Sequence, residues 1–121
     1  MIRRKKNSWL SAFRFAFNGI YIAFLLERNM KIHFFIAIFV FFLAYFYEIS
    51  KVEFILLVIA VMAVVITEMI NTAIEKVVDF ISPQFHKEAK KIKDLAAGAV
   101  LLAAFSSVII GYFIFFDKIF K

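Results

Sequence analysis

Three long runs of apolar residues alternate with short polar segments along the chain. The first run is uncharged from Ile32 to Tyr47, the second extends from Phe54 to Ile66, and the third is uncharged from Leu95 to Phe116. A membrane-spanning helix needs about 20 mostly apolar residues. The short alternating segments of a transmembrane β-barrel are absent from the sequence. The pattern therefore predicts three membrane-spanning helices.

The second run continues as a helix beyond its apolar part. The helical pattern extends to about Ile81, and Ser82 and Pro83 end it, because proline disfavours helix at the residue before it. A helix of about 28 residues measures roughly 42 Å, whereas the hydrocarbon core of a bilayer is about 30 Å thick. We expect the C-terminal end of this helix to extend into water.

Four polar side chains lie in the motif TEMINTAIEKVVD, residues 67–79 of this second helix. At about 100° per residue, Glu68, Asn71, Glu75 and Asp79 fall on one narrow face. Counting about 20 residues from Phe54 places Glu68 inside the membrane boundary and the two later acids at or beyond it. An acid inside the membrane costs about 2.5 kcal/mol or more and is functional by default. The alternatives are a simple hydrogen bond from Glu68 to a neighbouring helix, and ordinary solvated acids at the helix end.

The segment of about residues 8–28 has the pattern of an amphipathic helix. Its two faces are formed by Phe13, Phe17, Ile20 and Phe24 on one side and by Ser11, Arg14 and Asn18 on the other. Polar residues interrupt its apolar stretch and no small-residue cleavage site follows, which argues against a signal peptide. We expect this helix to lie on the membrane surface.

Composition and charge narrow the class of protein. The chain is 64% hydrophobic, has no cysteine and carries a net charge of +6. Disulfides and thiolate metal sites are thus excluded, and the long apolar runs exclude a soluble nucleic-acid-binding protein. Two segments, 1–31 and 76–93, hold most of the basic residues: Arg3, Arg4, Lys5, Lys6, Arg14, Arg28, Lys31, Lys76, Lys87, Lys90, Lys91 and Lys93. The positive-inside rule places both segments on the cytoplasmic side.

These observations predict an all-α integral membrane protein with a single domain, residues 1–121. Its expected parts are a surface helix (about 8–28), a first span (about 30–48), a second span (about 54–81), a cytoplasmic loop (82–93) and a third span (about 94–117). On the third span the small residues Ala99, Ala103, Ser107 and Gly111 recur every fourth position. Such a face allows helices to approach closely, although alanine is also simply common in membrane helices.

The acids and the neighbouring lysines together suit a magnesium–nucleotide complex. Carboxylate oxygens bind Mg²⁺, and lysines such as Lys90, Lys91 and Lys93 neutralise phosphate charge. Two other classes of function are open. An ion or proton pathway would need acids spread through the membrane depth, and a structural subunit would leave the acids without a purpose.

The motif EMINTAIEKVVD, residues 68–79, is similar to the signature E-x-x-N-[ST]-A-[IV]-E-x-x-[VI]-D. With AFNGI around Gly19, ERNMKIH at 27–33 and KDLAAGAV at 93–100, it makes the chain resemble the small prokaryotic diacylglycerol kinase family, which includes undecaprenol kinases. The resemblance implies a homotrimer of three-span subunits, each with an N-terminal surface helix, in the bacterial cytoplasmic membrane. It also implies sites shared between subunits, which transfer the γ-phosphate of ATP to a lipid hydroxyl at the cytoplasmic face.

The same resemblance implies residue roles. Glu68 matches the catalytic base, and Glu27 and Glu75 match the acids that hold Mg²⁺. The nucleotide site would comprise Asn71, Glu75, Asp79, His86, Lys93 and Asp94. We expect the lipid acceptor to lie beside Glu68, Ser11 and Phe17. For His86, an ordinary loop histidine is the alternative.

The acceptor lipid is less clearly indicated. The segment ERNMKIH, with Asn29 and His33, looks more like the undecaprenol kinases, so undecaprenol is preferred and diacylglycerol is the alternative. Apolar contacts discriminate poorly between lipid chains. For His33 itself the simpler interpretation is an interfacial histidine.

Overall fold

The computed structural model describes residues 9–120, which form four α-helices and no strand. The helices are α1 (Trp9–Leu26), α2 (Arg28–Phe46), α3 (Lys51–Ile81) and α4 (Lys87–Ile119). The basic residues Arg3, Arg4, Lys5, Lys6 and Lys121, and residue 8 of the expected surface helix, lie outside the described residues.

Local sequence signals explain where the helices begin and end. Glu27 has an extended backbone (φ −109°, ψ 119°) and separates α1 from α2. Ser50 caps α3 with a capping box, in which its hydroxyl accepts from the Glu53 N–H while the Glu53 carboxylate accepts from the Ser50 N–H. Between α2 and α3, Glu48 adopts a left-handed backbone (φ 49°) in the tight turn. At the other end α3 stops at Ile81, immediately before Ser82 and Pro83.

α4 begins earlier than the sequence pattern indicated. We expected residues 82–93 to be a polar, partly helical connection before a span that starts at about residue 94; α4 starts at Lys87 and the connection is confined to residues 82–86. The His86 imidazole caps the new start by accepting from the Glu88 N–H at 3.1 Å. Ion pairs one turn apart, Lys90 with Asp94 at 2.7 Å and Lys91 with Glu88 at 3.3 Å, support this polar turn. A run of charged residues therefore does not mark the end of a helix here.

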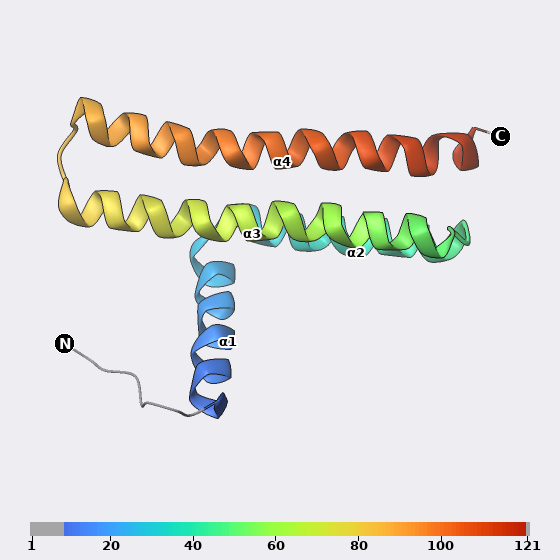
Figure 1. Ribbon diagram of the computed structural model, residues 1–121, viewed down its shortest axis with the longest axis horizontal. Coiled ribbons are helices and arrows are strands. Elements are labelled where there is room, and N and C mark those ends of the chain that lie inside the picture. The colour runs from blue at the N-terminus through green and yellow to red at the C-terminus, as the bar shows by residue number, and fades with distance from the viewer. Residues whose placement is uncertain (1–8, 121) are drawn as a thin grey trace.

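Helices α2, α3 and α4 run side by side, and α1 projects away from them. α3 and α4 lie antiparallel, α2 lies alongside α3, and α1 leaves the bundle at a steep angle (Figure 1). α1 joins the bundle partway along α3, so the C-terminal part of α3 and the start of α4 extend beyond that level (Figure 1). The 31 residues of α3 correspond to about 46 Å of helix, which exceeds the thickness of a bilayer core.

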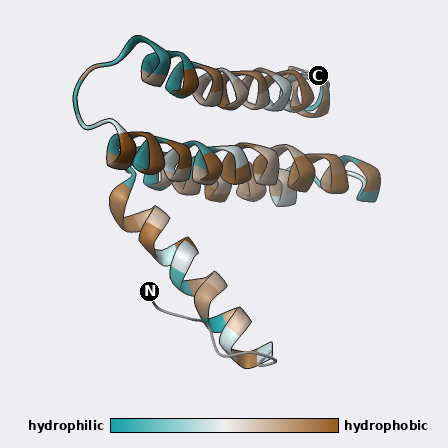
Figure 2. Ribbon diagram, turned by 60° about the vertical axis from the view of Figure 1, so that its left-hand side comes forward, coloured by the Kyte–Doolittle hydropathy of each residue, from teal (hydrophilic) through white to brown (hydrophobic). Residues whose placement is uncertain are grey.

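The outside of the bundle is apolar. Large side chains such as Phe39, Leu102 and Phe105 are exposed on the single chain, and all four helices are long and apolar enough to cross a membrane. Polar residues gather at the connection between α3 and α4 and at the start of α4 (Figure 2). By length and composition, α1 therefore also qualifies as a membrane-spanning helix. These two properties do not distinguish a spanning α1 from an α1 on the membrane surface.

The helix contacts follow small side chains. The Ser107 hydroxyl on α4 donates to the Ala60 carbonyl of α3 at 2.9 Å, a contact that requires close approach of the two helices. Ala103, Ser107 and Gly111 are partly buried, whereas Ala99 is exposed. The predicted contact face of the third span is thus confirmed at Ser107, whereas a Cβ atom at Gly111 would meet no neighbouring atom within 4 Å. Toward the α2–α3 turn, Ala44, Leu57, Ile114 and Phe115 form a buried apolar cluster.

Candidate active site

Glu68 is a buried carboxylate within the helix bundle. It lies on α3, is 4% exposed, and with Thr72 makes up the buried polar residues identified within 9–120. The His33 imidazole of α2 reaches it, with 3.3 Å between Nε2 and Glu68 Oε1. The Thr72 hydroxyl donates to the Glu68 backbone carbonyl at 3.0 Å. The carboxylate that the stripe predicted inside the membrane boundary therefore contacts a side chain of a second helix, while Thr72 bonds to the Glu68 backbone.

The next polar pair lies one turn further along α3. The Asn71 Nδ2 amide donates to Glu75 Oε1 at 3.3 Å, and both side chains are partly buried. The Asn71 Oδ1 atom is buried and has no hydrogen-bond partner. A buried acceptor without a partner is uncommon in folded proteins. It indicates a position where a bound molecule or water can donate a hydrogen bond.

The outermost part of the site joins α3 to α4. The Lys93 ammonium forms an ion pair with the Asp79 carboxylate. Both residues line a cavity of about 270 Å³ at the α3–α4 connection, together with His86 and Lys90. Asp94, by contrast, pairs with Lys90 on its own helix. The structure thus brings Asp79, His86 and Lys93 together and leaves Asp94 beside them on α4.

The two predicted metal ligands, Glu27 and Glu75, do not belong to a cluster of acids in the described residues. Glu27 lies at the break between α1 and α2, and its side chain does not cap α2. Within residues 9–120, no group of three or more His, Asp or Glu side chains is close enough to hold a metal ion. Mg²⁺ commonly binds through one or two carboxylates together with substrate phosphates. The metal role of Glu27 and Glu75 stays a prediction.

The two predicted lipid contacts on α1 lie apart from Glu68 within one chain. Ser11 is partly buried and Phe17 is exposed. Both belong to the N-terminal two-thirds of α1, which points away from the other helices (Figure 1). Their role in lipid contact stays a prediction.

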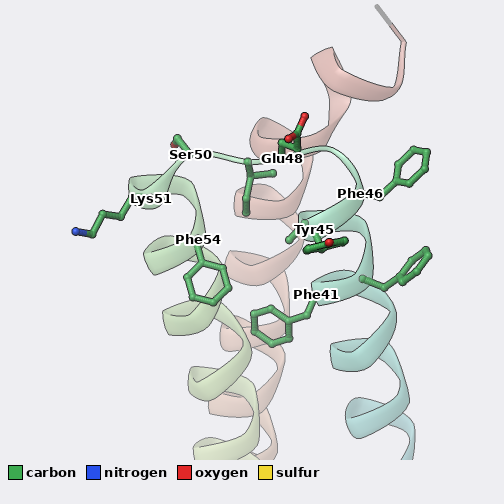
Figure 3. A pocket seen from close by; sticks show the side chains of 10 residues that line it. Phe41, Tyr45, Phe46, Glu48, Ser50, Lys51 and Phe54 are labelled. Atoms are coloured by element: carbon green, nitrogen blue, oxygen red, sulfur yellow. The ribbon is translucent and has the colours of Figure 1, made fainter.

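A larger cavity, of about 690 Å³, lies at the opposite end of the bundle, at the α2–α3 turn. Figure 3 shows its aromatic side chains, including Phe41, Tyr45 and Phe54, with Glu48 and Lys51 near the turn. None of the acids of the α3 stripe lines it. Cavity size alone therefore does not identify a reactive site, and the polar face of α3 is the candidate that carries the predicted residues.

Exposure rises along this face. Glu68 is buried, Asn71 and Glu75 are partly buried, and Asp79 is exposed. The face therefore runs from a buried acid to exposed charged side chains. Residues 14–115 match the family described as prokaryotic diacylglycerol kinase. The chain belongs to this family.

Individual relatives agree with the family match. A diacylglycerol kinase of Synechocystis is 40% identical over 114 residues, which are 88% of this chain and 65% of that protein. The undecaprenol kinase of Bacillus subtilis is 36% identical over 117 residues, 97% of this chain and 95% of its own. The diacylglycerol kinase of Escherichia coli is 39% identical over 62 residues, 51% of each chain. The diacylglycerol kinase family is one of lipid kinases, and this chain is an enzyme of that class.

In this member of the diacylglycerol kinase family, the sequence pattern did not predict the contact of His33 with Glu68. The interpretation of His33 as an interfacial histidine did not anticipate that its ring meets Glu68. One feature of the sequence could have pointed to a polar contact: His33 is a polar residue inside an otherwise apolar run. It also lies about two helical turns after Glu27, another predicted site residue. This feature does not show which neighbour His33 faces, because the rotation of α2 relative to α3 is determined only by helix packing.

Proposed function

We propose that this lipid kinase transfers the γ-phosphate of MgATP to the hydroxyl of a membrane lipid alcohol at the cytoplasmic membrane face. The observation that carries the proposal is the single polar face of α3. It begins at the buried Glu68 and ends at the exposed ion pair of Asp79 with Lys93. One end suits a lipid hydroxyl and the other suits a phosphate chain in water.

The proposed reaction assigns Glu68 as the base. The lipid hydroxyl oxygen forms a bond to the γ-phosphorus, its proton passes to the Glu68 carboxylate, and the bond to the β-phosphate oxygen breaks to release ADP. Phosphoryl transfer depends mainly on positioning and charge stabilisation. A carboxylate that lies just below the interface and is oriented by a neighbouring ring meets the positioning requirement.

Glu27 and Glu75 are the residues that would hold Mg²⁺, and Asn71, Asp79, His86, Lys93 and Asp94 those that would bind the nucleotide. When bound, Mg²⁺ would neutralise charge on the transferred phosphate. The unpaired Asn71 Oδ1 supports this assignment because it can accept from the nucleotide or a water bound to it. Lys93 supports it because an ammonium already paired with a carboxylate at the rim of a cavity can also face phosphate oxygens.

For the placement in the bilayer, we propose three spans, α2 to α4, with α1 on the cytoplasmic surface of the plasma membrane. The steep angle between α1 and the bundle supports this (Figure 1). So do the lysines of residues 87–93, which lie at the end of the bundle toward which α3 extends beyond α1. In this proposed placement, the Asp79–Lys93 pair lies in water on the cytoplasmic side and Glu68 lies just inside the membrane boundary.

We further propose that the working unit is a homotrimer whose sites are completed by a neighbouring subunit. The exposed apolar surface of the single chain supports association with lipid and with other copies. Within one chain, the N-terminal part of α1, which carries Ser11 and Phe17, points away from the other helices (Figure 1). In an oligomer, the α1 of a neighbour could bring those residues to the lipid beside Glu68.

The proposed acceptor is undecaprenol, with diacylglycerol as the alternative. The relative with 95% of its length aligned to this chain is named undecaprenol kinase, which supports this order. The test supplies the purified protein in bilayers with γ-labelled ATP and Mg²⁺, and with undecaprenol or diacylglycerol in separate reactions. Labelled undecaprenyl phosphate is the expected main product. Absence of label in both lipids, or wild-type turnover by a folded Glu68→Gln variant, would refute the mechanism, and proton flux without ATP would favour an ion pathway instead.

A further inference from the structure

The contact between His33 and Glu68 joins two different helices inside the apolar bundle. The Glu68 side chain is 6% exposed and the His33 side chain is 25% exposed. With its proton on Nε2, a neutral imidazole donates across the 3.3 Å to Glu68 Oε1. A hydrogen bond to a carboxylate in such surroundings is stronger than one in water. The other oxygen, Oε2, is not engaged by this bond.

The cavity on the other side of His33 has few groups that could donate a hydrogen bond to Glu68 in place of the imidazole. His33 lines a cavity of about 390 Å³ between α2, α3 and α4, whose other residues are apolar apart from Ser107. The Ser107 hydroxyl already donates to the Ala60 and Ala103 carbonyls. A Glu68 carboxylate that lost the imidazole would therefore gain no new donor from these walls, and its rotatable side chain would be free to turn.

We propose that His33 is a positioning residue for the lipid kinase reaction. It holds Glu68 Oε1 so that Oε2 faces the acceptor hydroxyl, and it does so from α2, outside the polar face of α3. This inference rests on the proposed function, since the base role of Glu68 is part of that proposal. It adds a residue to the site and makes the axial register of α2 against α3 part of the catalytic geometry.

The test removes the donor and then restores it. In His33→Leu and His33→Phe, kcat for lipid phosphorylation should fall about 10–100-fold, as expected for loss of a hydrogen bond to a charged group. The KM for ATP should stay within about twofold, because the nucleotide end of the site is untouched. In His33→Gln, whose amide nitrogen can occupy nearly the same place as Nε2, most of the lost kcat should return. A merely structural role would lower stability in all three variants and would show no such rescue.

Phe35→Leu is the matched control, because Phe35 lies on the same helix and is exposed; its kcat should equal that of the wild type. Wild-type kcat in folded His33→Leu and His33→Phe would overturn the positioning role. So would a loss of kcat that His33→Gln does not restore.

A readout without catalysis separates this inference from the proposed function. In ¹⁵N-labelled protein in micelles, the His33 Nε2 resonance should shift in Glu68→Gln and stay unchanged in Glu53→Gln, an acid at the other end of α3. No shift in Glu68→Gln would overturn the contact itself. If the shift occurs but wild-type protein phosphorylates no lipid, the proposed function fails while the contact stands.

Discussion

Asp79 in the last turn of α3 forms an ion pair with Lys93 in the second turn of α4. The pair spans the short connection of residues 82–86 and lies at the rim of the cavity there. Both side chains are substantially exposed, so the pair contributes little to stability by itself. Its position beside His86 at this cavity suits the proposed contact with a phosphate chain.

Removal of the Lys93 charge should weaken nucleotide binding. In Lys93→Met the KM for ATP should rise at least tenfold, because a charge-assisted contact to phosphate would be lost. Steady-state kinetics with a fixed lipid concentration measures this. Lys51→Met, a lysine at the α2–α3 turn and thus the opposite end of the bundle, should leave the KM for ATP unchanged. Equal effects of both substitutions would contradict a local phosphate contact.

Glu75 should affect the magnesium requirement. In Glu75→Gln the Mg²⁺ concentration for half-maximal activity should rise roughly tenfold or more, since an amide oxygen is a weaker ligand than a carboxylate. A titration of activity against Mg²⁺ at constant ATP measures the change. Asp117→Asn, near the C-terminal end of α4, provides the control. An unchanged Mg²⁺ dependence in an active Glu75→Gln enzyme would remove Glu75 from the metal site.

The helix contact at Ser107 should limit the size of the side chain there. Ser107→Val adds bulk and removes the hydrogen bond to the Ala60 carbonyl, so we expect a loss of about 1–3 kcal/mol in the free energy of unfolding. Ser106 is exposed and its hydroxyl bonds within its own helix, to the Leu102 carbonyl. Ser106→Val should therefore cost much less. Unfolding followed by circular dichroism in micelles compares the two, and equal stabilities would argue against close α3–α4 packing at this position.

The number of spans determines where the chain ends lie. If α1 lies on the surface and α2 to α4 cross the membrane, the N-terminus and the C-terminus are on opposite sides. If α1 also crosses, both ends are on the same side. Reporter fusions at each end, active on only one side of the membrane, should report the N-terminus in the cytoplasm and the C-terminus outside. Both ends in the same compartment would contradict the surface position of α1.

Much of the polar face of α3 could be predicted from the chain alone. The spacing of Glu68, Asn71 and Glu75 depends only on helical periodicity, and α3 is continuous through all of them. The end of α3 before Pro83 was predicted for the same local reason. The start of α4 was not predicted, because a charged turn in water can remain helical when ion pairs and a cap support it. The break at Glu27, where the backbone is extended, lies close to the predicted junction between the surface helix (about 8–28) and the first span (about 30–48).

The sequence by itself determined the helices, the lengths of their apolar parts and the order of acids along one face, because these depend on interactions between residues three or four positions apart. The tertiary structure decided which side chains from other helices meet that face: His33 at Glu68 and Lys93 at Asp79. These contacts depend on the rotation and axial register of whole helices. Those quantities are set by packing, as in the approach of Ser107 to Ala60, and local periodicity carries no information about them.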